Sequence, residues 1–585
     1  MSESRRRSFR GRAADELGAE VLPAEMTGHI VRKLVEDSAA MLARGPADAQ
    51  ARAQSAREFA VANLEDLHAG LRESMQERGV RYHRAGTAEE AAALVTELLG
   101  NARRVAKSKT MVGEEIGLTP ALRDAGIDVL ETDIGEYIVD IEGRGPSHIT
   151  APALHLNRVR IRELLSRGGA ELPDDDPTRL SQFVRDQVGA YFADCDAAIT
   201  GANGAVAASG RLLVVENEGN VSLGLSHPRK HIVVTGLEKV VAADEDALAL
   251  IQVLAPSATA QPLTAFTHLT AAPPPGQERH VVFVDNGRSQ VAADSRYRDV
   301  LRCIRCGACM NACPVYRVAG GLAYGSAYMG PIGAVVSPLL WTDGDYSDLP
   351  GASTLCGRCT EVCPVGIPLH RMLLDLRGDE VERSASGKGL AWRAWATAYG
   401  GGLRAKAAGM LASRAAPLGA RLAGERLPLG AAERARTPGA LQDAGPPRQF
   451  SPSEPPSGRP EPGSLADLFR SRATALGVHV VDESPAVQTG EAVVDAAAAV
   501  ASTGSVLLTA HSVDRRRLLA SSRIVVRVRP GIVVHYPADL LEFLAGHDDA
   551  LILTGASRTA DIEKQIVTGI HGPENLIVVF PREGA

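Results

Sequence analysis

Residues 303–314 read "CIRCGACMNACP", and residues 353–364 read "STLCGRCTEVCP". The first stretch is a complete C-x2-C-x2-C-x3-C-P motif. The second keeps the same spacing, but Ser353 stands where the motif asks for its first cysteine. Seven of the eight cysteines of the chain lie between residues 303 and 363. Motifs of this spacing bind iron–sulfur clusters, so the chain is predicted to hold two clusters side by side.

The spacing also predicts which thiols share a cluster. In two-cluster ferredoxin motifs, the fourth cysteine ligates the other cluster. The proline that follows it turns the chain away, because proline fixes φ and offers no N–H. We therefore expect the cysteines that precede Pro314 and Pro364 to be exchanged between the clusters. The expected ligands are Cys303, Cys306, Cys309 and Cys363 for the first cluster, and Cys313, Cys356 and Cys359 for the second.

The missing thiolate falls wholly in the second cluster. That cluster is either [3Fe-4S], which needs three thiolates, or [4Fe-4S] with a ligand other than cysteine. Ser353 is placed for this role by the motif, but an unactivated serine hydroxyl is a poor iron ligand. We favour a structural serine beside a three-cysteine cluster. Zinc sites use separated C-x2-C pairs, which four cysteines followed by proline do not match.

Length, charge and hydropathy exclude several classes of protein. The 585 residues suffice for about two to four domains. A net charge of −7 argues against general nucleic-acid binding, and no apolar run is long enough to predict a transmembrane helix. The paired arginines near the N-terminus precede no apolar segment, so a basic tail is favoured over an export signal.

Cysteine usage indicates the compartment. A secreted disulfide scaffold is small and spreads its cysteines along the chain, whereas here seven thiols are crowded together in a long chain. This pattern favours a metal or cluster site in a reducing, cytoplasmic compartment. Cys195, which stands alone, is expected to be a small buried apolar residue.

The pattern of apolar runs divides the chain into five parts. Short runs such as "HIVVTG" and "HVVFVD" alternate with helical stretches such as "EDALALIQVLA", which predicts an α/β domain with a mostly parallel sheet. The expected parts are an N-terminal helical segment (1–60), this α/β domain (61–290), a helical cysteine module (291–380), a basic helical stretch with a disordered linker (381–463), and a partial second α/β domain (464–585).

The last part repeats a portion of the first α/β domain. "AVAASGRLLVV" from residue 205 parallels "AVASTGSVLLT" from residue 499. Chance resemblance of Ala/Val-rich strands is the alternative, but the order and spacing of the strands favour an internal repeat. "TGAN" and "ENEG" of the first copy correspond to "VDAA" and "AHSV" in the second. Any site built from these polar residues is therefore expected to be absent from the second copy.

Several polar residues of the α/β domain are candidates for a ligand pocket. The "TGAN" turn offers hydroxyl, amide and backbone N–H groups that can cradle an anion, and two glutamates in "VENEGN" can act as acids or bases. The alternative is turn chemistry and solvated faces, and for the two histidines a satisfied structural role. The candidates are Thr200, Gly201, Asn203, Gly204, Glu216, Glu218, Lys107, Lys109, His148 and His155.

Together with the cysteine module, the segments "SKTMVGEEIGL", "DIGEYIVD", "HITAPALHLNRVRIRELL", "TGANGAVAASG" and "VENEGN" resemble the lactate utilization protein B family. That resemblance implies a LUD domain, an α/β fold similar to sugar isomerases and CoA-transferases, followed by an α-helical two-cluster ferredoxin module. The C-terminal "LILTGASRTADIEKQIVTGIHGPENLIVVF" looks like the end of lactate utilization protein C. The chain therefore resembles a fusion of B with a shortened C.

The resemblance implies an iron–sulfur electron-transfer subunit of a complex that oxidises L-lactate to pyruvate. It implies a separate, cysteine-rich protein A-like partner, names no electron acceptor, and assigns no catalytic residue in the LUD domain. One alternative is a LUD-domain enzyme with a CoA-transferase-like or isomerase-like site and structural or regulatory clusters. A redox-sensing binding module is another. Two clusters that exchange ligands favour electron transfer. Because the chain has no dinucleotide-binding G-x-G-x-x-G after a strand, we expect the electron path to lead to a partner outside this chain.

Overall fold

The computed structural model describes residues 8–19, 23–167, 171–340, 345–383, 462–486, 490–509, 514–563 and 565–580. Its internal contacts divide the chain into one unit made of residues 1–376 and 460–585, and a second unit made of residues 377–459. The predicted basic stretch and linker (381–463) lie outside the described residues except at their two ends. All the elements discussed below belong to the first unit, apart from the end of the last helix of the cysteine module.

The N-terminal segment is helical, and its helices continue past residue 60. Its helices are α1 (Phe9–Leu17), α2 (Pro23–Leu42), α3 (Ala49–Ala62) and α4 (Leu64–Glu77). Helix α3 buries the small side chains of Ala53, Ala56 and Ala60, so its backbone approaches its neighbours closely. It packs against α12 (Asp244–Thr259) of the α/β domain and against the 3-10 helix η3 (Arg298–Arg302) that precedes the cysteines.

The predicted α/β domain is built on a six-stranded, fully parallel sheet. Strands buried on both faces read as continuous apolar runs, which is what "HIVV" and "HVVFV" provide. In spatial order the strands are β1 (Val80–Ala85), β10 (Glu278–Val284), β7 (Lys230–Gly236), β4 (Ala197–Thr200), β2 (Arg104–Lys107) and β3 (Asp128–Glu131).

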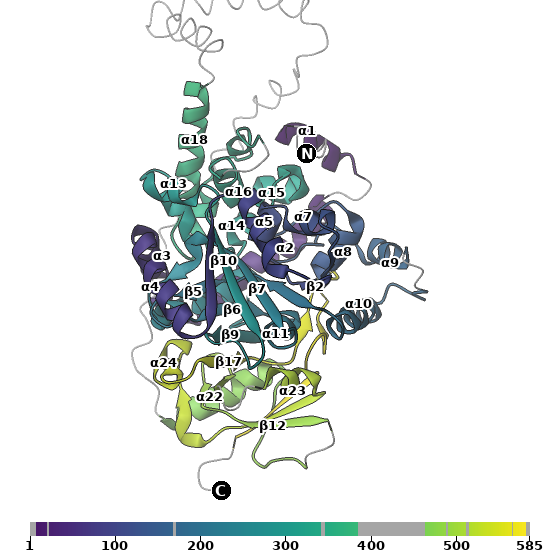
Figure 1. Cartoon of the computed structure of the whole chain (residues 1–585), viewed down its shortest axis with the longest axis vertical. Coiled ribbons are helices and arrows are strands. Elements are labelled where there is room, and N and C mark those ends of the chain that lie inside the picture. The colour runs from purple at the N-terminus through teal and green to yellow at the C-terminus, as the bar shows by residue number, and fades with distance from the viewer. Residues whose placement is uncertain are drawn as a thin grey trace, which may run out of the picture. The chain divides into compact units, whose positions relative to one another are not determined.

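Helices connect these strands and cover the sheet (Figure 1). Parallel strands need such crossover connections. The helices are α5 (Ala88–Leu99), α6 (Met111–Glu115), α7 (Leu118–Asp124), α8 (Ile134–Glu142), α9 (Arg158–Ser166), α10 (Pro177–Phe192), α11 (Asn220–Ser226), α12, and α13 (Arg288–Ala293).

A second, eight-stranded sheet joins the two ends of the described chain. Its order is β16 (Val533–Val534), β13 (Ala498–Val500), β14 (Ser505–Thr509), β17 (Asp549–Leu553), β9 (Phe266–Thr270), β6 (Leu212–Glu216), β5 (Gly204–Val206) and β8 (Val240–Val241). The four C-terminal strands meet the four N-terminal ones where β17 pairs antiparallel with β9, with Leu551 opposite His268. Figure 1 shows β9 and β17 next to one another. This mixed sheet was not predicted from the sequence.

The C-terminal part repeats the topology of the first α/β domain. Its parallel sheet has the order β11 (His479–Val481), β20 (Asn575–Val579), β15 (Arg523–Arg527) and β12 (Glu491–Asp495), which matches β1-β10-β7-β4. The remaining elements of this part are α22 (Pro462–Ala475), α23 (Arg515–Ala520), α24 (Leu541–Leu544), and the two-stranded pair β18 (Arg558–Thr559) and β19 (Val567–Thr568). The order of strands therefore agrees with the repeat seen in the sequence.

The cysteine module is a series of short helices, as predicted. Its helices are η3, α14 (Ala308–Ala312), α15 (Pro314–Ala319), η4 (Leu322–Tyr324), α16 (Gly330–Val336), η5 (Leu349–Gly351), α17 (Arg358–Glu361) and α18 (Leu369–Arg383). Helix α15 begins at Pro314 directly after Cys313, because proline is well suited to the first helical position. The module shares one apolar core with α12 and the eight-stranded sheet.

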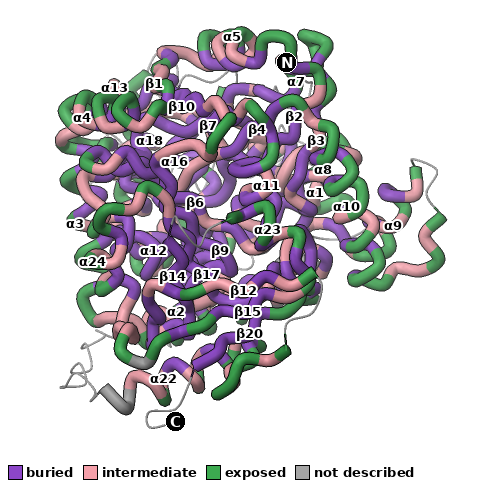
Figure 2. Tube along the Cα trace, turned by 60° about the horizontal axis from the view of Figure 1, so that its bottom comes forward, coloured by how far each residue is buried: buried purple, intermediate pink, exposed green. Residues whose placement is uncertain are grey.

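A buried arginine joins the module to the α/β domain. Arg57 is 2% exposed, and its guanidinium donates hydrogen bonds to the carbonyls of Arg302 and Leu301 on one side and of Val240 and Glu238 on the other. Figure 2 shows the surrounding strands β6, β7 and β9 buried, with exposed residues confined largely to outer helices and turns. The α/β domain and the module therefore share a continuous interior.

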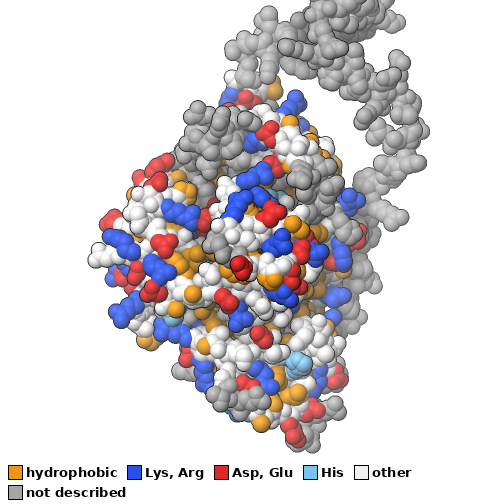
Figure 3. Space-filling model, turned by 90° about the vertical axis from the view of Figure 1, so that its right-hand side faces the viewer, with side chains coloured by type: hydrophobic (Ala, Val, Ile, Leu, Met, Phe, Trp, Pro, Cys, Tyr) orange, Lys and Arg blue, Asp and Glu red, His pale blue; other side chains and the backbone are white. Residues whose placement is uncertain are grey.

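The described surface carries charges of both signs. On the face in Figure 3, Lys and Arg side chains are interspersed with Asp and Glu, and ion pairs such as Arg123 with Asp140 occur on the surface. Among the helices of the described residues, none is long and apolar enough to cross a membrane.

Candidate metal centre and adjoining pocket

The two cysteine loops have the same backbone conformation. Arg305 and Gly307 have φ of 61° and 77°, and the equivalent Leu355 and Gly357 have φ of 56° and 84°. A positive φ is uncommon for a residue other than glycine, and here it occurs at the same position of both motifs. The chain thus wraps each loop in the same way, which is what a shared ligand geometry requires.

Ser353 occupies in its loop the position that Cys303 holds in the other. The Arg305 N–H donates to Cys303 Sγ at 3.4 Å, and the equivalent Leu355 N–H donates to Ser353 Oγ at 3.0 Å. The serine oxygen therefore accepts the backbone hydrogen bond that the sulfur accepts in the complete motif.

The thiols form two groups of electrostatic neighbours. Burial raises the pKa of Cys309, and the nearby thiols of Cys303, Cys306 and Cys363 raise it further. Burial likewise raises the pKa of Cys306, with Cys363 and Cys303 adding to the effect. The Cys363 thiol thus lies among the thiols of the first motif, although it belongs to the second.

The Cys313 thiol belongs to the first motif but lies among the thiols of the second. Burial raises the pKa of Cys359 to about 11, and the thiols of Cys313 and Cys356 add to the rise. Cys356 also raises the pKa of Cys313, whose shift comes mainly from burial. Of the seven cysteines, Cys356 is the exposed one. The second group therefore reaches closer to solvent than the first.

The surroundings of the thiols fit iron–sulfur clusters. Backbone N–H groups point at the sulfurs: the Ile367 N–H donates to Cys363 Sγ at 3.4 Å, and backbone hydrogen bonds from Ala308 and Ile332 lower the pKa values of Cys306 and Cys309 against the effect of burial. Such donors stabilise thiolates and are one of the features that set cluster potentials. All seven cysteines are free of disulfides, so every thiol is available as a ligand.

Positive charge is buried beside the first group of thiols. Lys239 Nζ donates to the Cys303 carbonyl at 2.9 Å, and Arg305 lies over the Tyr328 ring at 4.2 Å and near Glu238 at 3.4 Å. Arg288 Nε in turn contacts Glu238 at 2.6 Å. Cations close to a cluster favour its more negative, reduced state.

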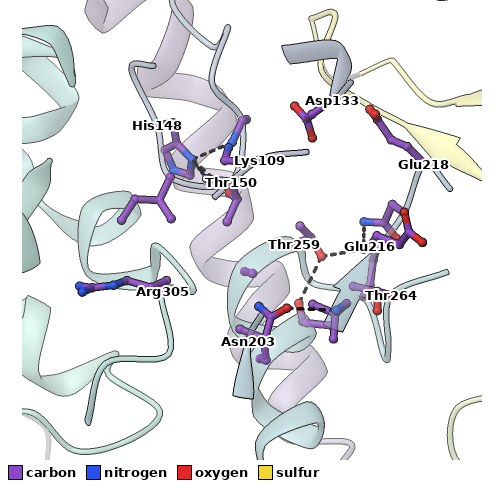
Figure 4. Close-up of a pocket in the computed structure, with 18 of the residues that line it drawn as sticks. Lys109, Asp133, His148, Thr150, Asn203, Glu216, Glu218, Thr259, Thr264 and Arg305 are labelled. Atoms are coloured by element: carbon purple, nitrogen blue, oxygen red, sulfur yellow. Dashed lines mark hydrogen bonds between the residues drawn. The ribbon is translucent and has the colours of Figure 1, made fainter. Parts of the chain in front are cut away.

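A cavity of about 760 Å³ adjoins the first group of thiols. Ile304 and Arg305, between the first two cysteines, line one wall, and Asn311 of α14 lines it as well. The α/β domain supplies most of the remaining lining, helix α2 of the N-terminal segment contributes five residues between 30 and 37, and residues 558–561 and 566 of the C-terminal part contribute the rest. Figure 4 shows charged side chains entering the cavity from several sides. The cavity therefore lies where the N-terminal segment, the α/β domain, the cysteine module and the C-terminal part meet.

Six of the ten polar residues singled out in the sequence line this cavity. They are Lys109, His148, Gly201, Asn203, Glu216 and Glu218. The other four lie outside its lining and are Lys107, His155, Thr200 and Gly204.

The side chains outside the cavity have structural partners. Lys107 Nζ contacts Glu131 Oε1 at 2.8 Å, the Thr200 hydroxyl bonds His231 Nε2 at 2.8 Å, and His155 lies 2.7 Å from Glu142. The predicted anion cradle in "TGAN" is therefore incomplete, because the Thr200 hydroxyl is used elsewhere.

His148 lines the cavity but is held by hydrogen bonds. Its Nε2 bonds Asn311 Oδ1 at 2.9 Å, and its Nδ1 accepts from the Thr150 N–H at 3.1 Å. It thereby links the α/β domain to α14 of the cysteine module. These contacts, with the one between His155 and Glu142, favour the structural role considered for both histidines.

The carboxylate of Glu216 is fully hydrogen-bonded. Its Oε2 accepts the N–H groups of Gly219 and Val221, and its Oε1 accepts from Ser222 and from His268 Nε2. These donors keep its pKa below the usual range despite complete burial. Glu216 therefore holds the turn before α11, and its contacts favour the structural alternative over the acid–base role.

Glu218 lies two residues further on in a different environment. It is 5% exposed, and burial raises its pKa well above the usual range, with Asp133 and Asp561 raising it further. Burial and Asp561 also raise the pKa of Asp133 to about 6, while Lys109 opposes the rise. One oxygen from each of the three carboxylates lies within 4.8 Å of the others.

Sequence reasoning missed two of these three carboxylates. Asp133 caps helix α8, since its Oδ1 accepts the Glu136 N–H at 3.1 Å, and an aspartate before an apolar helical run is a recognisable cap. The sequence did not show that Asp133 also lies next to Glu218 and Asp561. Asp561 lies in the C-terminal part, and only the fold brings it to residues more than 300 positions earlier.

Comparisons with known proteins match two stretches of the chain. The LUD domain family matches residues 69–282, and the 4Fe-4S dicluster domain family matches residues 299–367. Proteins named lactate utilization protein B from Bacillus thuringiensis (strain Al Hakam) and Bacillus cereus (strain B4264) are each 46% identical over 336 residues, covering 56% of this chain and 70% of theirs. A crystal structure of a duf162 family protein from Deinococcus radiodurans matches at 18% identity and a TM-score of 0.21, covering 38% of this chain and 98% of that one.

Proposed function

As a member of the lactate utilization protein B family, the chain has a role in lactate utilization and binds iron–sulfur clusters, and we propose that it is the electron-transfer subunit of a complex that oxidises L-lactate to pyruvate. The observation that carries this proposal is the pair of neighbouring thiol groups that exchange Cys313 and Cys363. Two clusters arranged in this way form a short electron path, whereas a purely structural role needs only one.

The first cluster in this proposal is [4Fe-4S] and the second [3Fe-4S]. The exchange of Cys363 into the first thiol group supports a four-thiolate site there. In the second group, Ser353 stands where the first group has Cys303, so this group offers three thiolates, and an unactivated serine hydroxyl is a poor iron ligand. The ligands are those expected from the spacing: Cys303, Cys306, Cys309 and Cys363 for the first cluster, and Cys313, Cys356 and Cys359 for the second.

The clusters supply one-electron transfer, and the chain's own residues set where electrons enter and leave. Cys356 is exposed, so the second cluster is the one that a partner can approach. The first cluster lies beside the cavity, beside the Arg305 guanidinium and beside Lys239, whose pKa burial lowers to about 7. The proposed partner is a separate cysteine-rich protein A-like subunit in a reducing, cytoplasmic compartment.

The repeated strand order supports a second proposal on architecture. The order β11-β20-β15-β12 equals β1-β10-β7-β4, as expected if residues 464–585 are a shortened LUD domain of the protein C type. Under this proposal the first LUD domain spans residues 61–290 and the ferredoxin module residues 291–380. The AHSV stretch that replaces "ENEG" in the second copy lies outside the described residues.

One observation favours a second candidate function. The cavity holds Glu218, a buried carboxyl with a raised pKa, and such a group can act as a general acid. A LUD-domain enzyme with structural clusters would place its chemistry here. The crossing thiol groups favour electron transfer over this candidate, because a structural cluster has no need of a neighbour.

The test is a reconstituted reaction. The chain is purified anaerobically, mixed with its protein A-like partner and given L-lactate, with D-lactate as a control. We expect the cluster absorbance to bleach and pyruvate to form with L-lactate. Cys359→Ala should block the transfer, while Cys195→Ala, a change in a half-buried thiol outside both groups, should leave it intact. Clusters that stay oxidised in the presence of both partner and L-lactate would contradict the proposal.

A further inference from the structure

Three carboxylates from distant parts of the chain meet at one side of the cavity. Asp133 stands at the start of α8, Glu218 in the turn between β6 and α11, and Asp561 two residues after β18. One oxygen of each lies within 4.8 Å of the other two. Figure 4 shows the side chains of Asp133 and Glu218 facing one another next to the strands of the C-terminal part. Each arrives from a different element, so the fold itself assembles the group.

The negative charge of this group is poorly balanced. Lys109 is the cation that lowers the pKa of Asp133, but its Nζ lies 3.4 Å from a fourth carboxylate, Glu136, which it also pairs with. Burial and mutual repulsion raise the pKa values of both Asp133 and Glu218. A single ammonium therefore faces several buried carboxylates.

An unsatisfied oxygen points to a missing ligand. Glu218 Oε2 accepts the Ile134 N–H at 3.2 Å, whereas Oε1 makes no hydrogen bond with any described residue. A side-chain hydrogen bond with Thr559 opposes the rise in the pKa of Glu218, so within this carboxylate the oxygen without a partner among the described residues is Oε1. Buried polar atoms of native proteins almost always have a partner, so an oxygen in this position calls for one from the cavity.

We propose that Asp133, Glu218 and Asp561 bind a divalent cation. Mg²⁺, Mn²⁺ and Ca²⁺ prefer carboxylate oxygens and complete their coordination with water. The cavity beside the group provides room for those waters or for a ligand that replaces them. A bound cation supplies the partner that Glu218 Oε1 lacks and removes the repulsion among the three carboxylates. The site is independent of the electron-transfer function proposed above.

The position of the site gives the cation a further structural role. Asp133 and Glu218 belong to the first α/β domain, whereas Asp561 belongs to the C-terminal part. A cation held by all three ties the C-terminal part to the wall of the cavity. Its removal should therefore loosen the C-terminal part more than the cysteine module.

The test uses Mn²⁺ as the probe on the full-length protein, purified anaerobically with its clusters and freed of divalent cations on an exchange resin. Free Mn²⁺ gives a sharp EPR signal at room temperature that is lost on binding. We expect about one Mn²⁺ bound per chain, displaced by excess Mg²⁺ or Ca²⁺. Asp561→Asn should weaken binding about tenfold or more, because losing a support of a metal site has effects of at least this size.

Controls keep the result interpretable. Glu563 lies two residues after Asp561, but its carboxylate pairs with Arg158 and is not part of the proposed site. The variant Glu563→Gln should therefore bind Mn²⁺ as the wild type does. Visible absorbance of the clusters reports that each variant is folded, and Glu218→Gln serves as a second ligand variant. If wild type binds no Mn²⁺, or if Asp561→Asn and Glu218→Gln titrate as the wild type does, the proposal is wrong.

A third ligand variant tests the remaining carboxylate. The variant Asp133→Asn removes the ligand contributed by the start of α8. It should weaken Mn²⁺ binding as Asp561→Asn does, and binding equal to that of the wild type would contradict the assignment of Asp133 as a ligand.

Discussion

Replacing Ser353 by cysteine tests how the second cluster is built. Ser353 Oγ accepts the Leu355 N–H at 3.0 Å, and Cys303 Sγ accepts the Arg305 N–H at 3.4 Å in the equivalent loop. A sulfur at position 353 therefore has to move by no more than the few tenths of an ångström that separate these distances. The loop already has the backbone of a complete motif, so Ser353→Cys should fold without rearrangement.

The expected effect is one additional iron per chain. A [4Fe-4S] and a [3Fe-4S] cluster together hold about seven irons, and two [4Fe-4S] clusters hold about eight. Anaerobic wild-type protein should show the EPR signal of an oxidised [3Fe-4S] centre. Ser353→Cys should lose that signal and gain a second reducible [4Fe-4S] centre, at a lower potential because the added thiolate makes the site more negative. Iron analysis and redox-titrated EPR measure both effects.

Ser353→Ala is the matched control. If Ser353 is structural, this variant keeps about seven irons and the three-iron signal. The reasoning is refuted if strictly anaerobic wild type already holds about eight irons and lacks that signal. In that case, loss of one iron from Ser353→Ala would identify the serine oxygen as the fourth ligand.

Three further predictions concern the architecture and the potentials. Arg57→Met should lower the free energy of unfolding by about 3–5 kcal/mol, since it leaves four buried carbonyls without their donor; urea unfolding followed by cluster absorbance measures this, and Arg52→Met on the exposed face of α3 should change it little. Arg305→Gln should lower the potential of the first cluster by roughly 40–90 mV, because it removes a buried cation worth about 1–2 kcal/mol per electron; an unchanged potential, or an equal shift in Arg358→Gln, would contradict this. Limited proteolysis should cut first within residues 440–463, whose Pro/Ser/Gly-rich composition cannot bury a core, and resistance throughout this stretch would show that it is packed.

The cysteine loops were predictable because their information is local. The spacing of thiols, glycines and prolines is contained within twelve residues. It also predicted that Ser353 takes the position in its loop that Cys303 takes in the other. The parallel sheet was predictable for a similar reason, because apolar runs such as "HVVFVD" signal strands that are buried on both faces.

The eight-stranded sheet and the carboxylate group were not predictable in this way. Strands such as β8 and β16 have two residues each, too few to show a period, and β9 finds its partner β17 about 280 residues away. Glu216 and Glu218 stand in one motif, yet the turn at Gly219 supplies N–H donors to the first and none to Oε1 of the second. Asp561 joins them only because the two halves share a sheet.

The exchange of cysteines between the motifs is tested most directly by EPR of two variants, Cys363→Ala and Cys313→Ala, purified anaerobically with their clusters. The Cys363 thiol lies among those of the first motif, so Cys363→Ala should lose the first, four-iron cluster and keep the three-iron signal. The Cys313 thiol lies with those of Cys356 and Cys359, so Cys313→Ala should lose the three-iron signal and keep the four-iron cluster. If each variant instead lost the cluster of its own motif, the ligand exchange and the electron path built on it would be wrong.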